Sequence, residues 1–382
     1  MTCSPRVRHP ALLCLLALGP ACGMSSEDAY LAGDDYGAPE VGPGSGGASD
    51  TADDPAQPEP DEPADPSGGQ ACNTADDVRL FLSPDDSNSM SSPVQARAAL
   101  LSEWASLAQV AIRPWEFLNY YRIAYPAAPA GSLGVHAAMV ISSDEAEGEY
   151  LLQIGVASPL ATVAARPPMN LTFVLDTSGS MDGAPLQALQ ASCRAIAENL
   201  VEGDVVSLVT WNTANAIVLA NHPVGGANDA ALLSAIDGLW ADGGTDLHGG
   251  LVAGYELAAQ AHRPGVVSRV ILISDGGANV GVTDVDTIAQ HAGAENQDGI
   301  YMVGVGVGTA ESYNDTLMDI VTDAGKGASV FVPDASEAAR VFGERFVSTM
   351  AIAARDVRVE LELPPGFEIV RFSGEEYSAD HI

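Results

Sequence analysis

The second half of the chain alternates short apolar runs with longer amphipathic stretches. The apolar runs include "LTFVLD", "DVVSLVTW", "SRVILISD", "GIYMVGVGV" and "ASVFVP". Strands that are apolar throughout and are separated by amphipathic helices are typical of a parallel sheet covered on both faces. We therefore expect an α/β fold: a doubly wound, mostly parallel sheet with helices on both faces, accompanied by a small flanking β domain.

Oxygen-bearing side chains stand where several of these apolar runs end. Asp176 closes "LTFVLD" and is followed by Ser178 and Ser180, Asp275 closes "RVILISD", and Thr245 lies in the glycine-rich turn "DGGTDL". In a doubly wound sheet, ligands bind beyond the carboxyl ends of the strands. An oxygen-only set suits a hard cation, so the sequence predicts a site for Mg²⁺, Mn²⁺ or Ca²⁺.

The motif D-x-S-x-S at Asp176, Ser178 and Ser180, with Thr245 in G-G-T-D and Asp275 in S-D-G, resembles the metal-ion-dependent adhesion site of von Willebrand factor A domains. The resemblance covers about residues 168–350. It implies that the three hydroxyls coordinate the metal, that the two aspartates coordinate it directly or through water, and that a partner carboxylate completes the shell.

A second resemblance concerns a wider arrangement. The stretches "RPPMNLTFVLDTSGSM", "SRVILISDGGANVGV" and "LPPGFEIVRFSGEE" are similar to bacterial exported proteins related to inter-alpha-trypsin inhibitor heavy chains.

Acids and hydroxyls elsewhere have simpler interpretations. The stretch "SPDDSNSM" also contains D-x-S-x-S, as Asp85, Ser87 and Ser89, but it lacks a buried strand before it, and we interpret it as a turn or helix cap. Asp182 and Asp246 lie beside the main motif and are interpreted as solvated acids. The alternative interpretation of the five motif residues is likewise that they only cap helices and stabilise turns.

Charge excludes some classes of partner. The chain has 16 Lys and Arg against 51 Asp and Glu, a formal net charge of −35. Nucleic acids and anionic membranes are bound through basic patches, so neither is expected as a partner.

The N-terminus predicts export. Basic residues precede the apolar stretch "ALLCLLALGPA", which is too short to span a bilayer, and Cys22 follows in "ACG". We interpret residues 1–22 as a signal peptide with a lipobox-like end and Cys22 as the lipidated residue of a bacterial cell-envelope lipoprotein. Ordinary cleavage, giving a secreted protein, is the alternative. An acidic disordered linker is expected over residues 23–75.

The folded part is expected to have three regions. Residues 76–167 are predicted to be a helical and β region, residues 168–350 the A-type domain, and residues 351–382 a C-terminally incomplete set of strands. Neither 134–158 nor 356–372 contains enough strands for a sheet with its own core. We therefore predict that these two flanks pair into one β domain into which the A-type domain is inserted.

The leading functional hypothesis is an envelope-tethered, metal-dependent protein-binding module that captures an acidic side chain of a partner protein and is not an enzyme. A metal-dependent hydrolase is the alternative; a haloacid-dehalogenase-type phosphatase would need a second aspartate where Ser178 stands and a cationic clamp, whereas Lys326 is the sole lysine. A metal-independent structural envelope protein is a third possibility. The oligomeric state, and whether Cys72 pairs with Cys193 or Cys193 is a buried free thiol, are left open.

Overall fold

A computed structural model provides the structure of the chain. The residues that it describes are 11–18, 78–82, 89–102, 106–142, 149–277, 281, 284, 299–309, 312–355, 357–363, 367–374 and 377–378. The predicted linker, Cys22, Cys72, Asp85 and Ser87 lie outside them.

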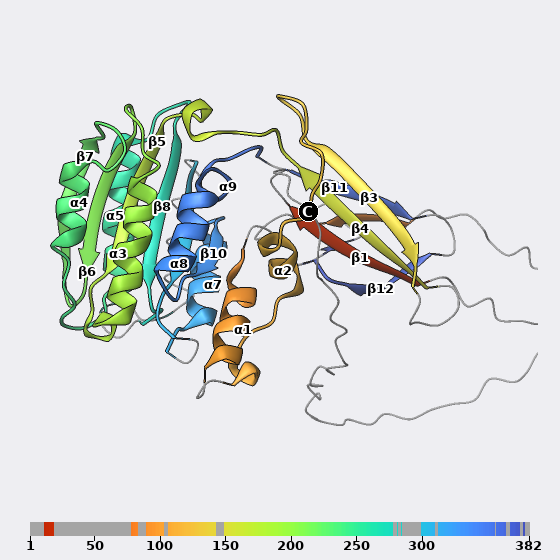
Figure 1. The fold of residues 1–382 in the computed structure, drawn as a ribbon, viewed down its shortest axis with the longest axis horizontal. Coiled ribbons are helices and arrows are strands. Elements are labelled where there is room, and N and C mark those ends of the chain that lie inside the picture. The colour runs from red at the N-terminus through yellow and green to blue at the C-terminus, as the bar shows by residue number, and fades with distance from the viewer. Residues whose placement is uncertain are drawn as a thin grey trace, which may run out of the picture. The chain divides into compact units, whose positions relative to one another are not determined.

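The centre of the fold is a six-stranded sheet in the order β10-β9-β8-β5-β6-β7 (Figure 1). Five strands are parallel and β7 is antiparallel to β6. Its strands are β5 (Met169–Asp176), β6 (Val205–Trp211), β7 (Asn215–Pro223), β8 (Val267–Ser274), β9 (Ile300–Gly306) and β10 (Ala328–Phe331). The predicted doubly wound, mostly parallel sheet is confirmed.

Strand β5 occupies the middle of this sheet because it is apolar on both faces. Every residue of β5 is buried, and its neighbours are β8 on one side and β6 on the other. The chain leaves β5 toward β6 and later returns on the other side at β8, so the winding direction reverses at β5. Such a switch point leaves a crevice at the carboxyl ends of the two strands.

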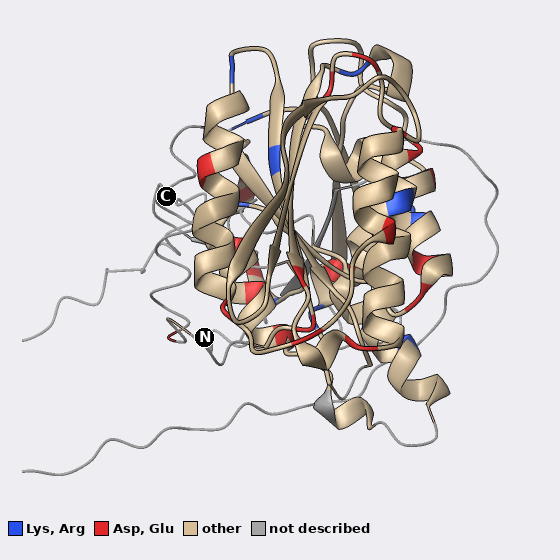
Figure 2. Cartoon of the chain, turned by 90° about the vertical axis from the view of Figure 1, so that its left-hand side faces the viewer, with Lys and Arg blue, Asp and Glu red and all other residues tan. Residues whose placement is uncertain are grey.

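Helices cover both faces of the sheet (Figure 2). Helix α5 packs on β5 and β6, and α7 packs on β9 and β10. The approach of α5 is close, because a β-carbon on Gly250 would lie 2.6 Å from the Trp211 side chain and one on Gly254 2.3 Å from Val174. The helices are α3 (Ala184–Ala197), α4 (Ala230–Asp237), α5 (Leu247–Ala261), α7 (Asp315–Ala324), and a last helix made of α8 (Ala335–Ala338), a π-helical segment η5 (Ala339–Glu344) and α9 (Phe346–Met350).

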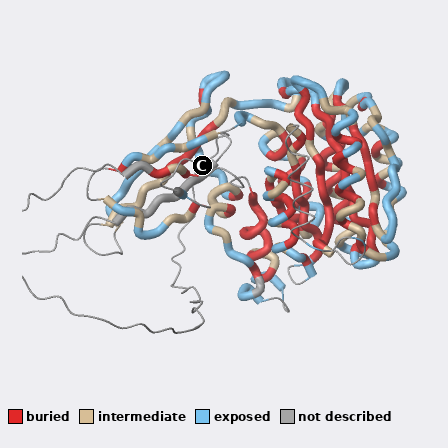
Figure 3. The backbone as a smooth tube through the Cα atoms, turned by 180° about the vertical axis from the view of Figure 1, so that it is seen from behind, coloured by how far each residue is buried: buried red, intermediate tan, exposed pale blue. Residues whose placement is uncertain are grey.

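The core lies between these layers, where every strand of the large sheet except the edge strand β7 is almost continuously buried (Figure 3). Arg166 and Asp204 anchor the beginning of β5 within it. Both side chains are fully buried, Arg166 Nη1 donates to Asp204 Oδ1 at 2.9 Å, and the backbone N–H of Met169 donates to the same oxygen at 2.8 Å. Cys193 is buried in this core and is a free thiol.

The region before the A-type domain contributes to the same core. It contains α1 (Ser91–Leu101), the 3-10 turn η1 (Leu107–Gln109) and α2 (Pro114–Tyr120), and Met90, Val94 and Tyr120 pack in the main hydrophobic cluster. The Met90 N–H donates to Ser329 O at 2.8 Å, and Ser89 Oγ accepts from Ser329 N at 2.9 Å. Ser89 and Met90 therefore satisfy the backbone groups of Ser329 on the outer edge of β10.

Two smaller sheets lie beside the main domain. One has the order β12-β1-β4-β3 and the other β11-β2-β13. Their strands are β1 (Ala11–Leu18), β2 (Val78–Leu82), β3 (Gly134–Ile141), β4 (Glu149–Ala157), β11 (Val359–Leu363), β12 (Glu368–Phe372) and β13 (Tyr377–Ser378), and the 3-10 turn η2 (Val163–Ala165) follows β4.

The predicted ladder between 134–158 and 356–372 is not among the pairings of the described residues. Strand β12 shares a sheet with β3 and β4, but β1 lies between β4 and β12 and is parallel to both. Strand β11 pairs with β2 in the second sheet. Strands β4 and β12 thus pair with β1, and β11 pairs with β2, both from earlier in the chain. One strand can serve two neighbours because its backbone N–H and C=O groups point to both edges.

The two flanks nevertheless share hydrophobic contacts. Buried Leu363 of β11 and Leu80 of β2 pack with Tyr150 and Leu152 of β4 and with Phe372 of β12. Insertion of the A-type domain between the flanks stays a proposal, resting on this shared cluster.

No helix among the described residues is both long and apolar enough to cross a membrane. The segment predicted as the apolar core of a signal peptide is strand β1 in this structure.

Candidate metal centre

The turn after β5 gathers three of the predicted residues. The Ser178 N–H donates to Asp176 Oδ1 at 2.9 Å, and Ser178 Oγ lies 3.1 Å from Ser180 Oγ. The 3-10 turn η3 (Gly179–Met181) follows at once. Asp176 and Ser178 are buried and Ser180 is exposed, so Ser180 marks the mouth of the site.

Two further loops bring Thr245 and Asp275 to the same place. The Gly179 N–H donates to Gly243 O at 3.1 Å, which joins the turn after β5 to the loop that carries Thr245. A β-carbon placed on Gly277 would lie 3.4 Å from Asp275 Oδ1 and 3.8 Å from Thr245 Oγ1, so these two oxygens border one space. Loops that the sequence separates by more than a strand and a helix thus meet at the carboxyl ends of β5 and β8.

Within the described residues, the two carboxylates have no compensating cation. Burial raises the pKa of Asp176 to about 6, the charge of Asp275 acts in the same direction, and hydrogen bonds from Ser178 and Ser274 oppose them. Among the described residues, neither aspartate forms an ion pair with Lys, Arg or His. Two adjacent buried acids and neutral hydroxyls form an oxygen-only donor set, which fits a divalent cation.

Ser274 is a site residue that the motif did not identify. Its Oγ donates to Asp176 Oδ2 at 2.7 Å and accepts from the Gly276 N–H at 2.9 Å. Each Asp176 oxygen therefore receives one hydrogen bond, which fixes the orientation of the carboxylate. The available signal was the hydroxyl residue directly before Asp275, at the end of a strand that is otherwise apolar.

The neighbouring acids have other contacts. Asp246 caps α5, with Oδ1 accepting from the Gly249 N–H at 3.1 Å, and Asp182 is exposed after η3. Within the described part of the chain, no three or more His, Cys, Asp or Glu side chains cluster as a metal site would require. The candidate centre depends instead on hydroxyl oxygens for most of its donors.

Comparison with known proteins identifies the family of this region. The model of the von Willebrand factor type A domain matches residues 170–344. The protein YfbK of Escherichia coli (strain K12) is 29% identical over 222 residues, 58% of this chain and 38% of YfbK. Inter-alpha-trypsin inhibitor heavy chain H2 of Sus scrofa is 28% identical over 154 residues, 38% of this chain and 16% of the heavy chain. This chain therefore spans less than half the length of either relative.

A solved structure of a von Willebrand factor type A protein from Catenulispora acidiphila aligns over 57% of this chain and 49% of its own, with 18% identity and a TM-score of 0.42. The assignment of the fold rests on the sheet order and the family model and not on this alignment. The family match contains all five residues of the oxygen-lined crevice, and the sheet around them has the predicted winding. Residues 170–344 of this chain are a von Willebrand factor type A domain.

Proposed function

We propose that the chain is a metal-dependent protein-binding module whose metal is held by Asp176, Ser178, Ser180, Thr245 and Asp275. This proposal is carried by the convergence of three loops, whose carboxylates form no ion pair among the described residues. Mg²⁺ is the proposed ion, with Mn²⁺ or Ca²⁺ as substitutes, since all the donors are oxygens.

The donor set favours binding of an outside acid over catalysis. A divalent cation held by few carboxylates and several neutral hydroxyls retains positive charge and would attract a carboxylate of a partner protein. Ser180 is exposed at the mouth, so a partner side chain can reach the crevice. The chain's own residues hold and orient the donors, and the partner is proposed to complete the shell.

The arrangement does not favour the phosphatase alternative. Ser178 occupies the position at which such an enzyme needs a second aspartate. Lys326 directly precedes β10 and therefore lies at the amino ends of the parallel strands, the edge opposite Asp176. It cannot clamp a phosphate at the candidate metal centre.

Calorimetric titration of the purified protein with Mg²⁺ and with Mn²⁺ tests the site. We expect one principal site, lost in Asp176→Ala and kept in Asp182→Ala, a matched change of an exposed neighbouring acid. Circular dichroism checks that both variants are folded. Undiminished binding by folded Asp176→Ala would contradict the assignment.

Partner capture needs a separate experiment. Proteins from an envelope extract that the wild-type chain retains with Mg²⁺ should be released by EDTA and absent with Asp176→Ala. Retention that is unchanged by EDTA and by the substitution would favour the metal-independent structural function.

We further propose that the chain is exported and anchored through a lipidated Cys22. The basic start, the apolar stretch and the sequence "ACG" support this proposal. Mass spectrometry of the mature N-terminus should find an acylated Cys22, and an unmodified terminus at another residue would leave a secreted protein.

A further inference from the structure

A pocket lies at the edge of the main sheet opposite the candidate metal centre. Its volume is about 300 Å³. Pro167 and Val267, at the amino ends of β5 and β8, line it from one side, and Ile352 and Arg355, from the segment after α9, line it from the other. Arg355 is the one charged residue among those that line the pocket, and the others are apolar.

Basic groups gather around Tyr301 beside this pocket. The guanidinium carbons of Arg355 and Arg269 lie 5.5 Å and 5.7 Å from the centre of the Tyr301 ring. A β-carbon on Gly299 would lie 3.5 Å from Arg355 Nη1 and 3.7 Å from His262 Cε1, so an imidazole borders the same space.

No carboxylate compensates this cluster within the described residues. The arginine ion pairs among the described residues are formed by arginines outside this cluster. Arg269 Nε donates instead to the backbone oxygen of Met350 at 3.1 Å. Burial lowers the pKa of Arg269 to about 10, the Tyr301 ring opposes this, and the charge of Arg355 adds to it. The repulsion between two guanidinium groups that contact one aromatic ring, with no carboxylate beside them, is reduced when an anion binds between them.

The scarcity of cations makes the cluster unusual for this chain. Acidic residues outnumber Lys and Arg by 51 to 16, and Figure 2 shows where the acidic (red) and basic (blue) positions lie along the ribbon. Two arginines that share one ring without an acidic neighbour among the described residues would gain a favourable interaction from an outside anion.

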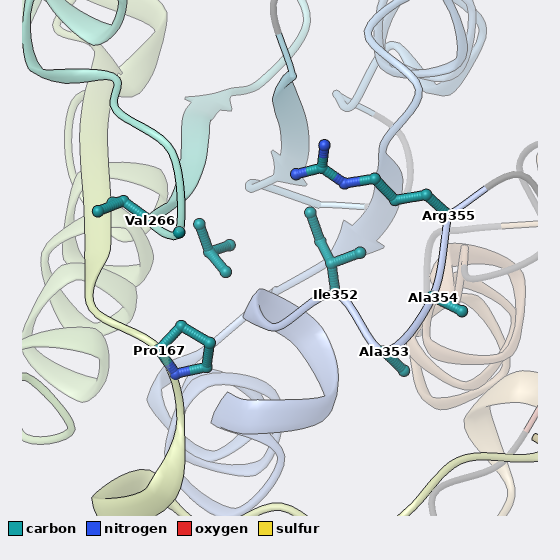
Figure 4. A pocket seen from close by; sticks show the side chains of 8 residues that line it. Pro167, Val266, Ile352, Ala353, Ala354 and Arg355 are labelled. Carbon is teal, nitrogen blue, oxygen red and sulfur yellow. The ribbon is translucent and has the colours of Figure 1, made fainter. Parts of the chain in front are cut away.

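We propose that this pocket binds a small aliphatic carboxylate. The carboxylate accepts hydrogen bonds from the exposed Arg355 guanidinium, which offers a planar, bidentate donor. The hydrocarbon part lies against Val266, Ile352 and Pro167. Figure 4 shows Pro167 and Val266 on one side of the pocket, and Ile352 with the extended Arg355 side chain on the other. A volume of about 300 Å³ is at the lower end for ligand pockets and suits an acid with a branched chain of a few carbons.

The test uses 4-methylpentanoate as the probe, with the neutral 4-methylpentanamide as its matched analogue. Binding is measured by calorimetry on the full chain carrying Asp176→Ala, in EDTA, because a metal at the other edge of the sheet would itself attract carboxylates. A negative result for this pocket can therefore be distinguished from a negative result for the proposed metal centre. We expect the acid to bind and the amide to bind at least about tenfold more weakly.

Arg355→Gln should weaken acid binding at least about tenfold, and Arg355→Lys should weaken it less, because lysine keeps the charge but loses the bidentate geometry. Arg358→Gln is the matched control, since Arg358 is exposed nearby and does not line the pocket. Equal binding of acid and amide, unchanged binding by Arg355→Gln, or no binding of the acid would each overturn the proposal.

Asp298 precedes Gly299 and Asp356 follows Arg355 in the sequence, and both lie outside the described residues, so Asp298→Asn and Asp356→Asn complete the set. Binding that appears only when one of these aspartates is replaced would mean that the chain already supplies the anion, and it would also overturn the proposal. Similar affinities for the acid of the Asp176→Ala chain with and without these replacements would support it.

Discussion

Ser274 Oγ donates a hydrogen bond to Asp176 Oδ2 at 2.7 Å, from the strand next to the one that Asp176 ends. The Ser178 N–H binds the other oxygen, so the carboxylate is held from both sides. Groups that orient metal ligands in this way usually change metal affinity when they are removed.

Ser274→Ala should therefore weaken Mg²⁺ binding about tenfold, because Asp176 loses the donor that fixes its Oδ2. Calorimetric titration provides the measurement. Ser268→Ala is the matched control, a buried serine near the other end of β8, and its metal affinity should equal that of wild type. Equal affinities of all three proteins would show that Ser274 has no part in positioning Asp176.

The buried pair of Arg166 and Asp204 should dominate local stability. Arg166→Met leaves Asp204 buried without its cation, and breaking a buried pair in this way typically costs about 3–5 kcal/mol in the free energy of unfolding. Arg194→Met breaks the Arg194–Asp237 pair, whose side chains are 44% and 63% exposed, and should cost less than about 1 kcal/mol. Urea unfolding of both variants measures the difference, and similar losses would contradict this ranking.

Glu116 should make stability depend on pH. Burial raises its pKa from 4.5 to about 7; the hydrogen bonds from Ser92 and the charge of Arg113 oppose this, and the charge of Asp315 adds to it. A carboxyl whose folded pKa is raised stabilises the fold while it is protonated, so this contribution is present below about pH 4.5 and is lost as the pH rises toward 7.

Glu116→Gln removes that titration, so the free energy of unfolding should fall less between pH 5 and pH 7.5 in the variant than in wild type, by on the order of 1–3 kcal/mol. Urea unfolding at the two pH values gives the comparison. Glu256→Gln, a change of an exposed glutamate on α5, should keep the wild-type dependence. Identical slopes in all three proteins would refute the assignment to Glu116.

The Cys193 thiol should be inert in the folded protein. It is fully buried, and burial raises its pKa, so very little of the reactive thiolate is present. With the other cysteines replaced by serine, labelling by a thiol reagent should be at least ~100-fold slower in buffer than in guanidinium chloride. Comparable rates in the two solutions would show that the site opens readily or is not buried.

The main sheet could be predicted because each of its strands is recognisable from its own short stretch of sequence. Apolar runs such as Leu171–Leu175 identify buried strands, and the residues that end them identify the crevice, since parallel strands place their carboxyl ends at one edge. Ser274 was missed because its role depends on a hydrogen bond to a neighbouring strand, which no local pattern records.

The small sheets were harder to predict for a related reason. Strand pairing is non-local, and alternation within β4 or β12 does not state which strand lies beside it. The contribution of Met90 and Val94 to the main core could not be predicted either, because the sequence of α1 and of its N-cap residue Met90 does not indicate which element they pack against.

Strand β1 and the apolar part of the proposed signal peptide are the same eight residues, Ala11–Leu18. If the chain is exported as proposed, these residues cannot pair with β4 and β12 while they pass through a translocation channel. In the proposed mature form, cleaved before Cys22, β4 and β12 would lose their common neighbour and would become two open edges that run in the same direction. Whether the export machinery binds the signal peptide before or after β1 pairs would then decide both where the protein resides and which sheet it contains.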